Sequence, residues 1–137
     1  MSGSQGSQDL GKAVLRIVLG ALILMHGIAK LKGGVGFVSQ VTTQAGLPAW
    51  TAYGVYIGEV VAPVLLIIGL WTRAAALITV VNMLFAIALV HTKQIGMLNE
   101  TGGWQLELQG MYLAAGLTLM LIGGGRLGVG GAGGKWN

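Results

Sequence analysis

The chain has 137 residues, of which 54% are hydrophobic and 9% are charged, and its mean hydropathy is +0.77. A soluble domain carries about 25% charged residues, so eight basic and four acidic side chains cannot cover a water-facing surface of this size. These values exclude a soluble globular domain and a disordered chain. The lack of cysteine in the sequence excludes disulfides and thiolate chemistry. The sequence therefore predicts an integral membrane protein with one domain.

Four apolar stretches are long enough to cross a bilayer as helices, since a span needs roughly 20 mostly apolar residues. They run over about Leu10–Leu31, Ala49–Leu70, Ala74–Thr92 and Leu108–Gly125. No small-x-small cleavage site follows the first stretch, so we expect it to stay as an uncleaved span. We predict an all-α integral membrane four-helix bundle over residues 10–127, between a flexible N-terminus (1–9) and a flexible Gly-rich tail (128–137).

Basic residues near the span ends indicate the orientation. Four spans place both termini and the 70–74 turn on one face, which holds five basic residues, whereas Lys30, Lys32 and Lys93 belong to the other. This bias favours termini in the cytoplasm of a bacterial inner membrane. Arg16 and Lys30 lie about 21 Å apart along a helix, so we expect them to reach opposite headgroup regions. The net charge of +4 therefore indicates contact with anionic lipid, and not with nucleic acid.

Polar side chains inside the predicted spans are the candidate functional residues, because placing them in lipid is costly. At about 1.5 Å per residue, Glu59 and Asn82 lie about 15 Å below the outer boundary, and His26 lies about 7–8 Å deep. We expect a funnel that is open to the outside and narrows with depth. From rim to bottom its residues are Lys30, His91, Glu107, His26, Asn82 and Glu59.

Glu59 is the group that we expect to handle protons. An unpaired carboxyl at this depth would be protonated, whereas His26 or Lys30 nearby would hold it ionised. Either state suits proton transfer or a hydrogen bond to a ligand carbonyl. The alternative is that Glu59 only pairs with Asn82 or His26 and fixes the register of the helices. Besides these groups, the residues expected to contact a ligand are Tyr56, Asn82, His91 and Glu107.

Local spacing gives further expectations about the second and third spans. Pro63 has no N–H for the carbonyl of Glu59, four residues earlier, so we expect the helix to kink there. Asn82 and His91 are nine residues apart, about 180° around a regular helix, which predicts that they face different sides. Small residues form a ridge that lets another helix pack closely, more often within a bundle than in a neighbouring subunit. The ridge consists of Gly54, Gly58 and Ala62.

Cofactors are less clearly indicated. His26 and His91 are the residue type that binds haem iron, but they differ in depth by several ångströms, which disfavours haem. We assign no metal site from the sequence.

Several motifs in a fixed order carry a family resemblance. They are Gly27-x-x-Lys30 followed by Phe37, Gly46-Leu47-Pro48, Glu59, Gly69-Leu70-Trp71-Thr72-Arg73-Ala74, His91, Gly102-Gly103-Trp104 with Glu107-Leu108, and Gly123-Gly124-Gly125-Arg126-Leu127. With them the chain resembles the DoxX family of small bacterial four-helix membrane proteins from about residue 10 to 127. It departs from the family pattern at Gln105-Leu106, and again after Arg126, where we expect a loosened C-terminal contact.

The resemblance implies a membrane subunit of a redox complex, because the family name comes from subunits of a thiosulfate:quinone oxidoreductase. We therefore expect quinone or proton handling in the outer half of the bilayer, with Glu59, His26 and Lys30 as the reactive groups. One alternative is a non-catalytic accessory subunit that stabilises a larger membrane complex or a homo-oligomer. Another is a small transporter, which would have to oligomerise to form a path with alternating access.

Overall fold

The structure is a computed structural model that describes residues 3–137. In chain order the elements are α1 (Gly3–Gly33), α2 (Gly36–Gln44), the 3₁₀ segment η1 (Ala49–Gly54), the π-helical segment η2 (Ile57–Val61), α3 (Ala62–Ile68), α4 (Thr72–Val90), the 3₁₀ turn η3 (Thr92–Gln94) and α5 (Glu107–Ile122). Within the described residues, the β-structure is a single bridge between Leu98 and Trp104. The all-α prediction is confirmed.

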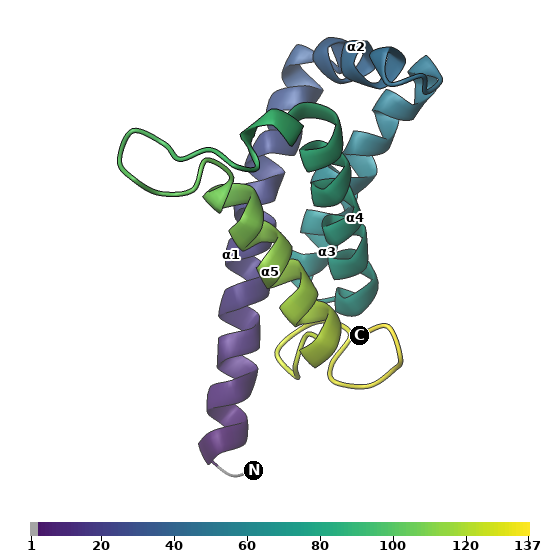
Figure 1. Ribbon diagram of the computed structural model, residues 1–137. Coiled ribbons are helices and arrows are strands. Elements are labelled where there is room, and N and C mark those ends of the chain that lie inside the picture. The colour runs from purple at the N-terminus through teal and green to yellow at the C-terminus, as the bar shows by residue number, and fades with distance from the viewer. Residues whose placement is uncertain (1–2) are drawn as a thin grey trace.

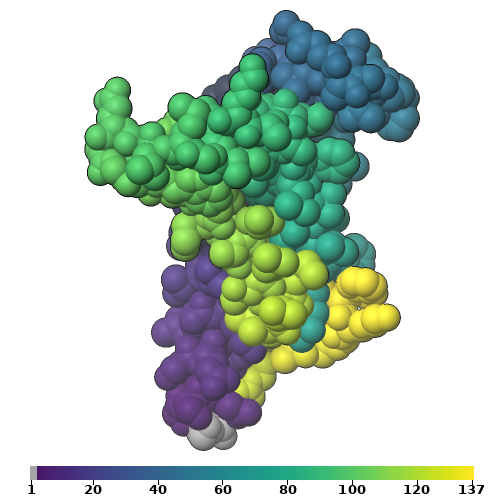
Figure 2. All heavy atoms as spheres, in the orientation of Figure 1, coloured from purple at the N-terminus to yellow at the C-terminus, as the bar shows by residue number. Residues whose placement is uncertain are grey.

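The long helices lie side by side, as Figure 1 shows. α5 packs chiefly on α4, and α3 packs chiefly on α1. The short helix α2 lies across one end of the bundle, and the loop between α4 and α5 projects at that same end (Figure 1). The tail after α5 folds back at the other end, beside α4 and α5 (Figure 2).

Among the described residues, three helical segments are long and apolar enough to cross a membrane: α1, the interrupted helix over 49–68, and α4. In the apolar 18-residue stretch of each, only 28% to 33% is buried inside the protein, and large side chains such as Leu84, Phe85 and Leu121 are exposed. A protein in water rarely exposes apolar patches of this extent, whereas lipid would cover them. The structure therefore supports a multi-pass membrane protein. α5, with 16 residues, is about 24 Å long, so the fourth span stays a prediction.

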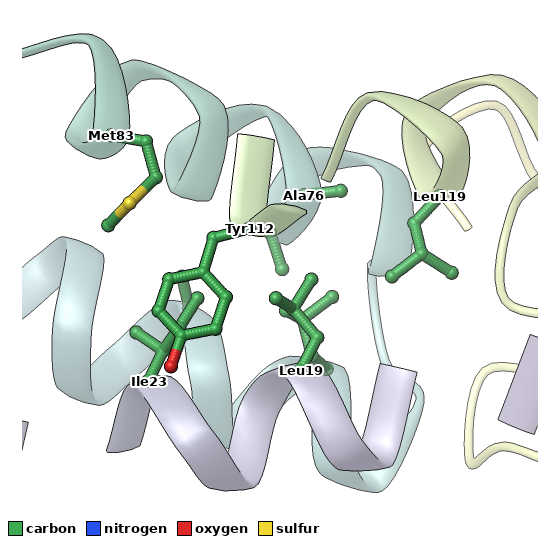
Figure 3. Packing of buried hydrophobic residues seen from close by; sticks show 9 residues of the cluster. Leu19, Ile23, Ala76, Met83, Tyr112 and Leu119 are labelled. Atoms are coloured by element: carbon green, nitrogen blue, oxygen red, sulfur yellow. The ribbon is translucent and has the colours of Figure 1, made fainter. Parts of the chain in front are cut away.

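The core alternates large and small side chains. Leu19 and Ile23 of α1 meet Tyr112 and Leu119 of α5, while Ala76 of α4 leaves room between them (Figure 3). Small residues let membrane helices approach closely, so that dispersion contacts hold them together. The core thus joins the middle of α1 to α3, α4 and α5.

The second apolar segment is interrupted where Pro63 leads the sequence to expect it. The chain passes from the 3₁₀ segment η1 through the π turn η2 into α3, with Pro63 in the first turn of α3. Pro63 cannot donate to the carbonyl of Glu59, so the preceding turn widens. Gly69, with a φ of 73°, then ends α3, because it and Leu70 both donate to the carbonyl of Leu65.

Gly27 brings α1 into direct contact with this interruption. A Cβ atom at Gly27 would overlap the backbone carbonyl of Glu59, and one at Gly20 would lie 2.8 Å from the carbonyl of Pro63. α1 therefore lies against the backbone of η2 and α3 at two glycines, seven residues apart. These two glycines of α1 are not part of the small-residue ridge predicted from the sequence, which lies on the second apolar segment.

The side chain of Arg16 does not extend to the surface of the protein, so the prediction that it snorkels is wrong. Its side chain is 1% exposed and donates only to backbone carbonyls. The acceptors are Leu66 at 3.1 Å, Ile67 at 2.8 Å, Leu127 at 2.9 Å and Gly124 at 3.3 Å. Carbonyls at helix C-termini lack intrahelical partners and carry partial negative charge. The guanidinium therefore joins α1 to the ends of α3 and α5.

The first part of α1 contacts the chain after α5 at this end of the bundle. α1 already begins at Gly3, so residues 3–9, expected to be flexible, are helical. Asp9 accepts from Arg126 at 2.8 Å, and Val129 N donates to Ile68 O at 2.9 Å. The contact after Arg126 is therefore formed and not loosened. The mobility of the tail stays a prediction.

We predict that Gly27→Ala destabilises the protein by about 1–3 kcal/mol, because the added methyl group would push α1 off the Glu59 carbonyl. Gly11→Ala is the matched control, since it is also in α1 and no atom lies within 4 Å of its would-be Cβ; it should leave stability unchanged or raise it slightly. Thermal unfolding of both variants in detergent tests this. Equal melting temperatures for the two variants would contradict the packing described here.

We also predict that Arg16→Gln lowers stability by about 3 kcal/mol or more, because several charge-assisted hydrogen bonds are lost and their acceptors stay buried. Arg126→Gln is the control. Its side chain is 43% exposed and makes one ion pair, so its loss should change stability by less than about 1 kcal/mol. Denaturant unfolding monitored by circular dichroism would compare them. The role given to Arg16 fails if both variants unfold at the same denaturant concentration.

Candidate functional site

A cavity of about 620 Å³ lies in the half of the bundle that α2 covers. Its walls come from the second halves of α1 and α4, from η2 and from the first turns of α5, while α2 and η1 close one side. Most lining side chains are apolar. The charged, amide and aromatic polar groups among them are His26, Lys30, Glu59, Asn82, His91, Gln109 and Tyr112.

An ion pair forms part of the cavity wall. Lys30 Nζ lies 2.5 Å from Glu59 Oε2, and Asn82 Nδ2 donates to Glu59 Oε1 at 3.5 Å. The Lys30 side chain is 27% exposed and that of Glu59 is 10% exposed. The carboxylate therefore has a partner on each oxygen while one side still faces the cavity. The structure brings together three of the residues that the sequence indicated.

Two glycines make this arrangement sterically feasible. Gly27 lets α1 reach the backbone carbonyl of Glu59 in η2. Lys30, one turn later in α1, then faces the side-chain carboxylate of the same Glu59. Gly58 does the same for α4, because a Cβ there would lie 2.5 Å from the Asn82 side chain. The motif Gly27-x-x-Lys30 and the dipeptide Gly58-Glu59 therefore act together. In each, the glycine lets a neighbouring helix come close and the charged residue contacts a polar side chain of that neighbour.

His26 and His91 both line the cavity but have other partners. The ring of His26 meets the edge of Tyr112, with centroids 6.5 Å apart, and Nδ1 of His91 lies 2.7 Å from Oε1 of Gln94. The expectation that Asn82 and His91 face different sides does not hold. α4 ends at Val90, and His91 leaves the helical path with φ of −113° and ψ of 10°, so its ring returns to the cavity.

Tyr56 and Glu107 do not line the cavity. The Tyr56 hydroxyl donates to the carbonyl of Lys30 at 3.1 Å, so it supports the last turn of α1. Glu107 begins α5 and accepts from Asn99 Nδ2 at 3.3 Å, which ties it to the neighbouring loop. The geometry gives both residues local structural partners instead of a place against a ligand.

The predicted small-residue ridge is split by the change of helix type. Gly58 faces Asn82 and Ala62 is fully buried, so both lie inside the bundle, whereas the would-be Cβ of Gly54 points into open space. The ridge therefore serves packing within this chain at two of its three positions.

Gln109 and Tyr112 are cavity residues that sequence reasoning missed. They lie three residues apart, on one face of the first turns of α5. A tyrosine in the middle of an otherwise apolar stretch was the available signal, because its hydroxyl needs a polar neighbour.

A match to a known protein family covers most of the cavity residues. The sequence model of the DoxX family matches residues 11–92, a range that includes Lys30, Glu59, Asn82 and His91. The chain belongs to the DoxX family.

Two relatives of this DoxX protein share much of its length. One is a Bacillus subtilis (strain 168) protein named "Putative oxidoreductase CatD", 31% identical over 108 residues, covering 79% of this chain and 80% of the relative. The other is an "Uncharacterized protein" of Haemophilus influenzae (strain ATCC 51907 / DSM 11121 / KW20 / Rd), 38% identical over 86 residues and 58% of each chain. No solved structure matches this DoxX protein significantly.

We predict that Lys30 and Glu59 are energetically coupled. Lys30→Met should destabilise the protein by about 1–3 kcal/mol because it leaves a carboxylate without its cation, and Glu59→Gln added to it should recover part of that loss. Thermal unfolding of the two single variants and the double variant gives the coupling energy, which we expect to exceed about 0.5 kcal/mol. Strictly additive effects would show that the two side chains do not act as a pair.

Proposed function

We propose that this DoxX-family protein is the membrane subunit of a redox complex, and that it binds a quinone in the cavity beside Glu59. The observation that carries this proposal is the Lys30–Glu59 ion pair in the wall of a largely apolar cavity of about 620 Å³. Removing two charges from water is costly, and apolar side chains of similar size would hold the helices together as well. The presence of an ion pair at this place is therefore better explained by a role in binding or proton transfer than by helix packing.

The volume and the lining suit a quinone headgroup. Small-molecule sites are about 300–1,000 Å³ in volume, mostly apolar, with a few polar groups that orient the ligand. Here Lys30 can donate a hydrogen bond to one ligand carbonyl. His26 and Tyr112, together in the wall formed by α1 and α5, offer a second set of polar atoms.

Proton transfer follows from the same groups. Reduction of a quinone to a quinol takes up two electrons and two protons. We propose that the electrons come from a partner redox protein, and that the Lys30–Glu59 pair delivers a proton to the quinone oxygen. Lys30 would pass its proton to one quinone oxygen, the pair would be reprotonated from water at the nearby end of the bundle, and a second transfer by the same route would supply the proton for the other oxygen. Such positioned proton transfer typically contributes about 10²–10⁴-fold to a rate.

The bilayer offers a route to the cavity for an apolar ligand. Several lining residues are also exposed on the outer surface, among them Phe37 of α2 and Val81 and Phe85 of α4. α2 touches α4 at few positions. A quinone could thus enter from lipid between these helices and leave its isoprenoid chain outside.

The charge distribution indicates on which side of the membrane the cavity lies. The basic residues favour cytoplasmic termini in a bacterial inner membrane, and the cavity lies in the half of the bundle away from the termini. The site would then face the outer half of the bilayer. The relative's name, "Putative oxidoreductase CatD", is in keeping with redox chemistry.

We predict that Glu59→Gln keeps the fold but abolishes quinone reduction by the assembled complex, because glutamine can still accept from Lys30 and cannot carry the proton. Reduction of decylubiquinone by membranes that contain the complex measures the rate, and gel filtration of the purified variant checks the fold. Glu100→Gln, an exposed carboxylate of the outer loop, is the control and should leave the rate unchanged. A Glu59→Gln complex with normal turnover would remove this proposal.

A further inference from the structure

A second, smaller pocket of about 240 Å³ lies at the end of the molecule away from the cavity. It is formed where the first turns of α4 and the end of α5 meet the tail, and it is lined by Arg73, Leu77, Met120, Lys135 and Trp136. Figures 1 and 2 show the tail at this end, beside α4 and α5. Nothing in the proposed function uses these residues.

The pocket is positively charged. Two of its five lining residues are cations and none is a carboxylate. The acidic side chain at this end of the bundle, Asp9, already pairs with Arg126 at 2.8 Å. The two ion pairs found among residues 3–137 involve neither Arg73 nor Lys135. Lys135 Nζ lies over the Trp136 ring, 5.4 Å from its centroid, so neither cation of the pocket has a carboxylate partner and both can still pair with an anion.

Arg73 also has an unmet hydrogen-bond donor. Its Nε and the hydroxyl of Thr72 are the two buried side-chain atoms without a hydrogen-bond partner among residues 3–137. The backbone at this point is satisfied, because Arg73 N and Ala74 N both donate to Trp136 O, at 2.9 and 3.3 Å. The unmet capacity thus belongs to side chains of the Thr72-Arg73 motif. An unpaired buried donor costs about 1–3 kcal/mol, so an anionic oxygen near it would be stabilising.

The depth of the pocket matches the headgroup layer. α4 has 19 residues and is about 28 Å long, close to the hydrocarbon thickness of about 30 Å, and Arg73 lies in its first turn. Trp71, which precedes the motif, and Trp136, whose carbonyl accepts from Arg73 N, are both exposed, as is typical of side chains at a membrane interface. Leu77, one turn further along α4, and Met120 add apolar walls on the membrane side.

We propose that this pocket binds the phosphate group of an anionic phospholipid from the leaflet on the side of the termini. Arg73 and Lys135 would contact the phosphate oxygens, for which a guanidinium fork is well suited. Leu77 and Met120 would contact the glycerol end of the acyl chains. These apolar walls favour a lipid over free phosphate. Because Lys135 and Trp136 belong to the tail, the bound lipid would also hold the tail on α4.

Native mass spectrometry of the full chain, released from a non-ionic detergent, tests this with phosphatidylglycerol and phosphatidylcholine as probes. The wild type should retain phosphatidylglycerol in preference to phosphatidylcholine. Arg73→Gln and Lys135→Gln should each weaken phosphatidylglycerol binding about fivefold, the effect expected for one cation at a membrane surface. Arg73→Lys should restore part of it. Lys93→Gln removes a cation that follows the other end of α4 and should bind like the wild type.

Three results would overturn the proposal. They are equal retention of the two lipids by the wild type, unchanged binding in both glutamine variants, and displacement of the lipid by an excess of inorganic phosphate, which would indicate a site for free phosphate. Lys135 is an exposed tail residue, so Lys135→Gln keeps the test valid even if Arg73→Gln fails to fold. Quinone reduction does not enter this readout, so failure here leaves the proposed function standing, and the reverse also holds.

Discussion

The contact between Gly27 of α1 and the backbone carbonyl of Glu59 is the constraint on which the rest of the structure depends. Pro63 leaves that carbonyl without its helical partner and widens the turn before it. A helix can approach such a turn only where it carries no side chain. Once α1 lies there, Lys30 is one turn away from the carboxylate of the same residue, and the ion pair follows at 2.5 Å. The cavity begins next to that pair, where the helices diverge toward α2.

Arg16 and Lys30, two cations of α1, are stabilised in different ways. Arg16 meets backbone carbonyls from α3 and from the chain after α5, and its planar group spreads one charge over several acceptors. Lys30 is a compact charge and meets a carboxylate. The first arrangement holds one end of the bundle together without an exchangeable proton. The second leaves an acid and a base in contact at the edge of a cavity, which is why the proposed chemistry is placed there.

Membership of the DoxX family and the apolar outer surface together describe a multi-pass membrane protein with two different ends. At one end the tail and the termini are joined by Arg16, by Asp9–Arg126 and by the contacts of Trp136. At the other end α2 and η1 close one side of a cavity that has polar groups in its wall. Lipid contact at the first end and ligand binding at the second are the two proposals that this asymmetry supports.

The sequence by itself determined the membrane class, the helical fold, the interruption at Pro63 and the choice of Glu59 as the central group, with His26 or Lys30 as its charged neighbour. These properties depend on residues a few positions apart, or on the cost of a polar group in lipid, and both can be deduced from composition and spacing. Only the tertiary structure decided where Arg16 points, because its acceptors lie 50 to 111 positions along the chain. The same holds for His91, which returns to the cavity after α4 ends, and for Glu107, which is held by Asn99 outside it. Helix periodicity describes which face a residue occupies, whereas the partner of a polar side chain depends on how closely other helices approach that face.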